Sequence, residues 1–386
     1  MKWRTIPLDA VKAPVLYAFV GGPFGSNLTT RDYVEEGVPV IRGNNLPADR
    51  AFLDDDFVFV TEKKADDLRP NAAYPGDLVF TQRGTLGQIG LIPLEARFQR
   101  YVISQSQMKL SVDPEVADAR FVYYFFRLPA TVQKVINHAI TSGVPHINLG
   151  ILKDFEITLP EIDCQQRTAD ILSAYDDLIE NNRQRMALLE EAARQLYREW
   201  FVRLRFPGHE HTRITKGVPE GWEQVPLGER VTLNYGKSLK AEDRTDGPCP
   251  VYGSSGIVGY HEKSLAQGPG IVIGRKGNVG SVYWSAKDYW PIDTVYYVDP
   301  QTSNLWFYYA LQQMHFISTD VAVPGLNRDF AYSRLFLVPP ARHLHAFLDT
   351  VEPLHEQVDK LGEMNKKLSA ARDLLLQRLM NGEIAV

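Results

Sequence analysis

Two glycine-rich stretches come closest to nucleotide-binding chemistry. Gly236-Lys237-Ser238 resembles the end of a phosphate-binding loop, but that motif needs a further glycine where Val231 stands. The glycines of the stretch 253–259 have the wrong spacing for a dinucleotide or S-adenosylmethionine loop, and no β-α-β pattern surrounds them. We therefore expect this chain to bind no cofactor of its own.

Candidate metal ligands and nucleophiles are poorly placed. The close histidine pairs His209/His211 and His343/His345 have no acidic partners at ligand spacing, which favours solvated linker histidines. Cys249 has no histidine placed to activate it, and the chain's other cysteine is far away in sequence. Two reduced packing thiols are the simplest interpretation. We expect no metal site and no catalytic residue.

Side chains able to hydrogen-bond to base edges lie in short polar segments. Arginine and lysine suit guanine, asparagine and glutamine suit adenine, and flanking glycines allow the backbone to approach a groove. Such turns are common and are weak evidence alone, but these recur at matching places in two halves of the chain. The candidate DNA contacts are Arg42, Asn44, Asn45, Gln82, Arg83, Thr85, His146 and Asn148 in the first half, and Lys237, Tyr252, Ser254, Ser255, Arg275, Lys276, Asn278, Asn327 and Arg328 in the second.

The two halves match because the sequence consists of two copies of an internal repeat. Each copy runs from a β-rich region punctuated by glycine and proline, through a short amphipathic helix (121–128 or 305–314), to a long helix. Motifs recur in the same order, which indicates a tandem duplication. The matches are Trp3-x-x-Ile6-Pro7-Leu8 with Trp222-x-x-Val225-Pro226-Leu227, Phe24-Gly25 with Tyr235-Gly236, Pro39-Val40 with Pro250-Val251, Arg83-Gly84 with Lys276-Gly277, and Val144-Pro145-x-Ile147-Asn148 with Val323-Pro324-x-Leu326-Asn327.

The long helices carry an apolar stripe that advances by alternating threes and fours, as in a coiled-coil seam. Roughly forty residues would form a rod of about 60 Å, which needs a partner along its length. We expect the two helices to pack on each other antiparallel; two separate helical hairpins, or a seam between two copies of the chain, are the alternatives. The seam residues are Leu172, Ile179, Asn182, Met186, Leu189 and Leu196 in the first helix, and Val351, Leu354, Val358, Leu361, Asn365, Leu368 and Leu375 in the second.

The predicted fold class is α+β, with two β-rich domains separated by two long helices that form an antiparallel coiled coil. The predicted boundaries are 1–160 for the first β-rich domain, 161–205 for the central helix, 206–221 for a linker, 222–340 for the second β-rich domain and 341–386 for the C-terminal helix.

Composition is that of an ordinary soluble globular protein, with 44% hydrophobic and 23% charged residues. No stretch predicts a membrane span or a secretory signal, so we expect a cytoplasmic protein. The formal net charge is −5, and none of the predicted regions is basic. If DNA is the partner, positive charge must be clustered locally, or another subunit must supply much of the grip on the backbone.

The chain resembles the DNA-specificity subunit of type I restriction-modification enzymes. The residues that carry this resemblance are Val38–Leu46, Gly143–Leu149, Pro250–Tyr260, Arg275–Gly280 and the junction Leu159-Pro160-x-x-x-x-Gln165-Gln166-Arg167. The similarity covers essentially the whole chain, and its motifs are short but specific as a set.

The resemblance implies that each β-rich region is a target recognition domain for one half of a bipartite site in double-stranded DNA. It implies that the paired helices fix the spacer between the half-sites and dock two methyltransferase subunits, which bind S-adenosylmethionine. It also implies restriction subunits that use ATP and Mg²⁺. None of these cofactors would bind this chain.

Other functions remain open at this point. The chain could be a nucleic-acid enzyme itself, although it lacks the motifs, or a coiled-coil scaffold whose β-domains bind protein or glycan. It could also be the DNA-specificity adaptor of another methylation-based defence system that has no cleaving subunit.

Overall fold

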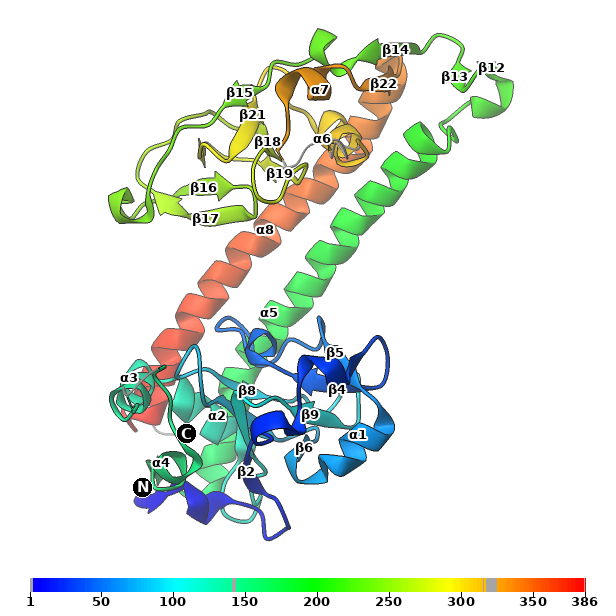
Figure 1. The fold of residues 1–386 in the computed structure, drawn as a ribbon. Helices are drawn as coiled ribbons and strands as arrows, with labels where there is room; N and C mark the ends of the chain where they lie inside the picture. Colours follow the sequence, from blue (N-terminus) through cyan, green and yellow to red (C-terminus); the bar gives the residue numbers. More distant parts are fainter. Residues whose placement is uncertain (1–2, 141–143, 315, 317–324, 385) are drawn as a thin grey trace. The chain divides into compact units, whose positions relative to one another are not determined.

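The computed structural model describes residues 3–140, 144–314, 316, 325–384 and 386, so Gly143, Val323 and Pro324 of the motifs above lie outside them. The chain divides into two compact units (Figure 1). The first comprises Met1–Gln184 and Gly362–Val386, and the second comprises Arg185–Leu361. Each unit thus contains one β-rich region and a part of each long helix.

The β-rich part of the first unit has two main sheets. One is antiparallel, with strand order β2-β10-β7-β8, and the other has the order β3-β5-β4-β9-β6, with β4 parallel to β9. A separate antiparallel pair joins β1 to β11. The strands are β1 (Arg4–Pro7), β2 (Phe19–Gly21), β3 (Tyr33–Val34), β4 (Val38–Ile41), β5 (Val58–Val60), β6 (Ala72–Ala73), β7 (Leu78–Thr81), β8 (Ile89–Leu91), β9 (Tyr101–Ile103), β10 (Gln107–Leu110) and β11 (Glu156–Leu159).

The second unit repeats this topology. Its antiparallel sheet has the order β15-β21-β18-β19, and a smaller sheet has the order β17-β16-β20, with β16 parallel to β20. The pair β14-β22 corresponds to β1-β11. The strands are β12 (Ile214–Thr215), β13 (Val218–Pro219), β14 (Glu223–Pro226), β15 (Asn234–Tyr235), β16 (Cys249–Gly253), β17 (Gly256–His261), β18 (Gly270–Gly274), β19 (Val282–Ser285), β20 (Trp290–Pro291), β21 (Val295–Val298) and β22 (Leu335–Val338).

Both predicted amphipathic helices form. The side chain of Asp118 caps one of them by accepting from the main-chain N–H groups of Arg120 and Phe121, and Asn304 caps the other through the N–H of Phe307. Both helices bury aromatic side chains under the antiparallel sheet of their unit. The shorter helices are α1 (Glu62–Asp67), α2 (Ala119–Arg127), α3 (Pro129–Asn137), α4 (Leu149–Lys153), α6 (Leu305–Gln312) and α7 (Arg328–Tyr332).

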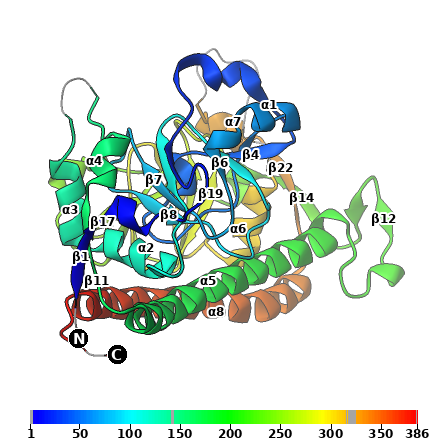
Figure 2. The ribbon, with the colours of Figure 1, turned by 90° about the horizontal axis from the view of Figure 1, so that it is seen from below.

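The long helices are α5 (Ile162–Tyr197), which continues as a π-helical turn over Arg198–Val202, and α8 (Ala341–Met380). Within each unit they pack antiparallel, as predicted, and lie side by side in both views (Figure 2). Every predicted seam residue is buried or half-buried. These contacts within one chain favour mutual packing over separate helical hairpins.

The contacts that define this packing occur in both units. In the first unit, Asn182 Nδ2 donates to Asn365 Oδ1 at 2.8 Å. In the second unit, the ring of Phe347 lies 5.1 Å from that of Phe201, between centroids. The helices also share a core with the β-rich region of each unit: Leu172 and Leu376 are buried with Leu8, Phe121 and Ile157 in the first, and Tyr197 and Phe347 are buried with Leu227, Ile271 and Trp306 in the second.

Candidate nucleic-acid interface

Three polar segments of the first unit are brought together by main-chain hydrogen bonds. The N–H of Gln82, just after β7, donates to the carbonyl of Ser106 at 2.7 Å. The carbonyl of Gln82 accepts from the N–H of Ile147 at 3.1 Å, and Arg83 forms a β-bridge with His146. The N–H of Ser104 donates to the carbonyl of Ile41 at the end of β4. The loops after β4 and β7 therefore meet the segment before α4 around the turn 104–106.

The second unit has the same hydrogen bonds. The N–H of Arg275 donates to the carbonyl of Thr294, and its carbonyl accepts from the N–H of Leu326, both at 2.9 Å. Lys276 forms a β-bridge with Gly325, and the N–H of Ile292 donates to the carbonyl of Tyr252. This equivalence places Arg275 where the first unit has Gln82, and Lys276 where it has Arg83. The duplication in the sequence is therefore a duplication of the loop framework as well.

The structure supports the alignment of the repeats at one place and corrects it at another. Ile41 and Tyr252 make the equivalent hydrogen bond, as the match of Pro39-Val40 with Pro250-Val251 implies. A Cβ added at Gly22 would lie 2.1 Å from a main-chain oxygen of the turn 104–106, and one added at Gly236 would lie 2.1 Å from the equivalent oxygen of Ile292. Gly236 therefore matches Gly22, where a close approach of two main chains requires glycine, and not Gly25.

The loop after β4 is tied to an acidic segment of its own unit. Asn45 is fully buried; its Oδ1 accepts from the N–H of Arg42, and its Nδ2 donates to the carbonyls of Leu53 and Asp55. Arg42 and Asn44 donate to Asp56, the former to its carbonyl and the latter also to its carboxylate at 2.7 Å. Asn45 therefore stabilises the loop and presents no free group to a base, because its amide is already hydrogen-bonded inside the protein.

The other polar residues of the first unit lie at or near the surface. Arg83 and Thr85 are exposed, whereas Gln82 and His146 are half-buried beside them. His146 Nδ1 lies 3.0 Å from the carbonyl of Val144. Asn148 caps α4 by accepting from the N–H of Ile151, so its Oδ1 already has a structural role.

In the second unit, Tyr252 is also turned inward. Its side chain is buried, and its hydroxyl donates to the carbonyl of Trp284 at 3.2 Å. Ser254 Oγ accepts from the N–H of Asn278 at 3.4 Å, so the β16–β17 turn contacts the loop after β18. Ser255 and Asn278 are exposed there. Tyr252 therefore stabilises these loops from the interior of the unit, and Ser255 and Asn278 form part of their outer surface.

The second unit gathers cations that are distant in sequence. Lys237 and Lys276 are exposed, and their N–H groups donate to the carbonyls of Pro291 and Thr294, respectively, in one short segment. Arg275 and Arg328 both lie against the ring of Tyr235, a residue that the sequence analysis did not select. The signal for it in the sequence is its place in the repeated motif Tyr235-Gly236, directly before Lys237. Asn327, like Asn148, caps its helix, through the N–H groups of Asp329 and Phe330.

Because the formal net charge is −5, a DNA-binding surface on this chain would need a local concentration of positive charge. The cluster of Lys237, Arg275, Lys276 and Arg328 is such a concentration. Among the ion pairs that join described residues, none includes Lys237, Arg275, Lys276 or Arg328. Burial is the main cause that raises the pKa of Tyr296 to about 12; neighbouring Tyr235 adds to the rise as a hydrogen-bond partner, and both arginines oppose it. These cations are therefore available to an external anion.

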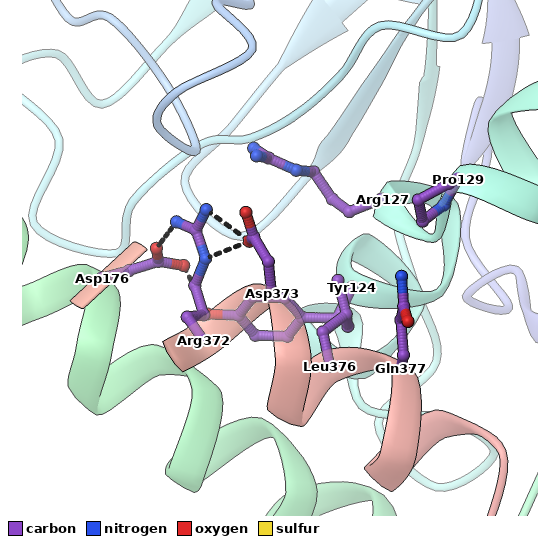
Figure 3. A pocket seen from close by; sticks show the side chains of 8 residues that line it. All are labelled: Tyr124, Arg127, Pro129, Asp176, Arg372, Asp373, Leu376 and Gln377. Carbon is purple, nitrogen blue, oxygen red and sulfur yellow. Dashed lines mark hydrogen bonds and ion pairs between the residues drawn. The ribbon is translucent and has the colours of Figure 1, made fainter. Parts of the chain in front are cut away.

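A second polar cluster lies inside the first unit, between α2, α5 and α8 (Figure 3). Arg372 donates to the carboxylates of Asp176 and Asp373, and the hydroxyl of Tyr124 donates to Asp176 at 2.6 Å. Burial and the charge of Asp176 raise the pKa of Tyr124. Burial opposes the charge of Arg372, but Asp176 outweighs it and the pKa rises. The adjoining cavity, also lined by Arg127, measures about 140 Å³. Opposite charges satisfy each other here, so the cluster serves helix packing.

Over the described part of the chain, no group of three or more histidine, cysteine, aspartate or glutamate side chains is arranged to hold a metal ion. None of the helices in that part is long and apolar enough to cross a membrane.

Comparison with known proteins identifies the family. The model of the type I restriction modification DNA specificity domain matches residues 31–191 and 219–330, more than half of the chain. The chain belongs to this family. The two matched segments correspond to the two copies of the repeat.

Curated relatives of this family are similar along most of their length. The type I restriction enzyme MjaIX specificity subunit of Methanocaldococcus jannaschii is 22% identical over 365 residues, which cover 85% of this chain and 82% of the relative. The HindI specificity subunit of Haemophilus influenzae is 21% identical, with coverage of 74% and 81%. The crystal structure of a type I restriction-modification S subunit from M. genitalium has the same fold, with a TM-score of 0.57, 18% identity and coverage of 98% of this chain and 96% of that one.

Proposed function

We propose that this specificity subunit reads a bipartite site in double-stranded DNA, with one β-rich region, a target recognition domain, for each half-site. The observation that carries the proposal is the duplicated loop framework. The same main-chain hydrogen bonds hold Gln82 and Arg275 in place, yet the side chains differ. A constant framework with different polar side chains suits a protein that reads two different short sequences.

The structure narrows the set of proposed base contacts. Asn45 and Tyr252 are withdrawn because both are buried and hydrogen-bonded internally. Asn44 and Arg42 are weak candidates, since the aspartates beside them would repel phosphates. Asn148 and Asn327 cap helices with their Oδ1 atoms and could offer only their Nδ2 groups. The remaining candidates are Gln82, Arg83, Thr85 and His146 for one half-site, and Lys237, Ser254, Ser255, Lys276 and Asn278 for the other.

Catalysis in this proposal belongs to partner subunits. The relatives are named as specificity subunits, and the sequence has no motif for S-adenosylmethionine or ATP. Two methyltransferase subunits would bind S-adenosylmethionine, and restriction subunits would use ATP and Mg²⁺. This chain would contribute sequence recognition and the docking surface.

The long helices are the proposed docking surface for the methyltransferase subunits. Leu178 and Leu374 are exposed on the helices of the first unit, and Leu188 is 70% exposed on α5 in the second. Large apolar side chains on an otherwise polar helix surface are typical of contact sites for other proteins. They support a protein partner on these helices beyond the internal seam.

The test is to purify the chain with its cognate methyltransferase subunit and to map adenine methylation across a genome. We expect a two-part motif with a fixed gap. Two matched variants refine the test: Arg83→Ala should relax one half of the motif and Lys276→Ala only the other, each at a cost of about 1–3 kcal/mol in discrimination. A continuous motif, or the absence of any motif, would contradict the proposal.

A further inference from the structure

Two arginines of the second unit stack on one tyrosine. The Cζ atoms of Arg275 and Arg328 each lie 5.3 Å from the centre of the Tyr235 ring. Arg275 also lies 5.7 Å from the ring of Tyr296, which packs 5.0 Å from Tyr235 between centroids. Three separate elements therefore converge on this point: the end of β15, the turn after β18 and the start of α7.

Among the described residues, no carboxylate forms an ion pair with either guanidinium group. Arg275 Nη2 donates to the main-chain oxygen of Asp293 at 2.7 Å, and its buried Nε has no hydrogen-bond partner. Asp293, whose main-chain oxygen binds Arg275, and Asp329, which follows Arg328, form no ion pair within the described residues. Two like charges on one ring repel each other, and cation–π contacts offset this only in part. An anion bound close to both guanidinium groups would offset the repulsion.

We propose that Arg275 and Arg328, held by the ring of Tyr235, form a binding site for a DNA backbone phosphate. This inference rests on the proposed function and assigns to the two arginines a role other than base reading. The planar guanidinium fork matches phosphate oxygens. Phosphate contacts fix a protein's register on the duplex and carry no direct sequence information. Lys276 and Asn278, in the turn beside this site, then read the bases.

Among the described residues, the first unit has no equivalent of this site. Its framework equivalents of Tyr235, Arg275 and Arg328 are Gly21, Gln82 and Leu149, and none of them is charged or aromatic. At this position of the framework the two units therefore differ, and the proposed phosphate site belongs to the second unit.

The test uses the full chain in complex with its methyltransferase subunit. DNA affinity is measured by fluorescence anisotropy over a series of KCl concentrations, on a duplex with the mapped motif and on one of equal length without it. Arg275→Gln and Arg328→Gln should each weaken binding to both duplexes by the same factor, on the order of tenfold at low salt. Each should also make the slope of log K against log salt shallower by about one, and the methylation motif should stay unchanged.

Control variants distinguish the contribution of the Tyr235 ring from that of the positive charges. Tyr235→Phe keeps the platform and should match the wild type, whereas Tyr235→Leu should resemble the arginine variants. Lys263→Gln, an exposed lysine beyond the far end of the β16–β17 hairpin, should leave the slope unchanged. Arg328 is exposed, so its variant tests the site even if Arg275→Gln impairs folding.

Three results would contradict the inference. An unchanged salt slope, a loss confined to the motif-bearing duplex, or a changed base in the methylation motif would each overturn the phosphate site. The last two results would indicate base reading and leave the proposed function intact. Failure of the wild-type complex to bind either duplex would instead overturn the proposed function.

Discussion

At the scale of single residues, the polar side chains of these loops have two roles: some stabilise the loops from inside, and others lie on the surface. Asn45 and Tyr252 hold the loops from inside, while Arg83 and Lys276 stand on the surface at equivalent positions. Residue types suited to base edges can be recognised from the sequence, but an asparagine that hydrogen-bonds within its own loop has the same residue type as one that would face DNA. Only the accounting of buried hydrogen bonds separates these roles.

One half-buried histidine, His355, gives the second unit a pH-dependent stability. Burial lowers the pKa of His355 to about 4, and its Nε2 lies 2.7 Å from the hydroxyl of Tyr309, which donates to the neutral ring. In the unfolded chain a histidine titrates near 6.5. The unfolded state therefore binds more protons between these values, and the stabilisation present above about pH 6.5 is lost as the pH falls towards 4.

We expect the wild type to lose about 2 kcal/mol more than His355→Gln between pH 7 and pH 4.5, because glutamine still accepts from Tyr309 but does not titrate. Urea unfolding followed by tryptophan fluorescence checks this, since every tryptophan except Trp3 lies in the second unit. Equal losses in the two proteins would show that His355 does not contribute.

At the scale of elements, the long helices were the most predictable part of the chain. Their stripe of apolar residues is sustained over many turns, so local irregularities do not hide it. The β-strands were less predictable, because most are only two to six residues long and are defined by partners far away in sequence. The repeat was recognised, but its alignment failed at Tyr235. The alignment matched similar residue types, whereas the structurally equivalent positions are Gly22 and Gly236, where two main chains approach closely.

The asparagine pair in the seam makes a testable contribution to helix packing. Asn182→Leu removes the donor to Asn365 Oδ1 and leaves a buried acceptor unsatisfied, so we expect a loss of about 1–3 kcal/mol in unfolding free energy. The double variant Asn182→Leu/Asn365→Leu should recover most of this loss, because an apolar layer has no unsatisfied group. Thermal unfolding followed by circular dichroism, arranged as a double-mutant cycle, measures the coupling. Strictly additive effects would show that the two amides act independently.

At the scale of the whole molecule, the main organisation could be predicted from the sequence. The duplication, the two β-rich regions and the antiparallel helices follow from repeated motifs and periodicity, and the family match supports them. The sequence does not determine which residues would contact bases or how large the gap between the proposed half-sites would be. Both depend on loop geometry and on DNA shape, neither of which is encoded in residue type alone.

Both long helices run without interruption from one unit into the other, so their length is proposed to set the gap in the DNA site. Removal of seven residues from each, 184–190 in α5 together with 357–363 in α8, preserves the heptad phase of the seam. We expect genome-wide methylation mapping to show a changed gap with both half-motifs intact. Removal of the seven residues from α5 alone is the control. It should impair folding, because the seam residues of α5 beyond the deletion no longer face their partners on α8. An unchanged gap in the matched deletion would rule out this role for the helices.

The repeated hydrogen bonds of Gln82 and Arg275 have a consequence for how such a protein can acquire new preferences. The partners of these main-chain groups are themselves main-chain atoms, so these particular hydrogen bonds do not depend on which side chains project from the turns. A substitution of an exposed side chain in these turns, such as Arg83 or Lys276, leaves the main-chain hydrogen bonds in place. In the proposed function, the DNA sequence that is read could therefore change while the loop framework stays the same.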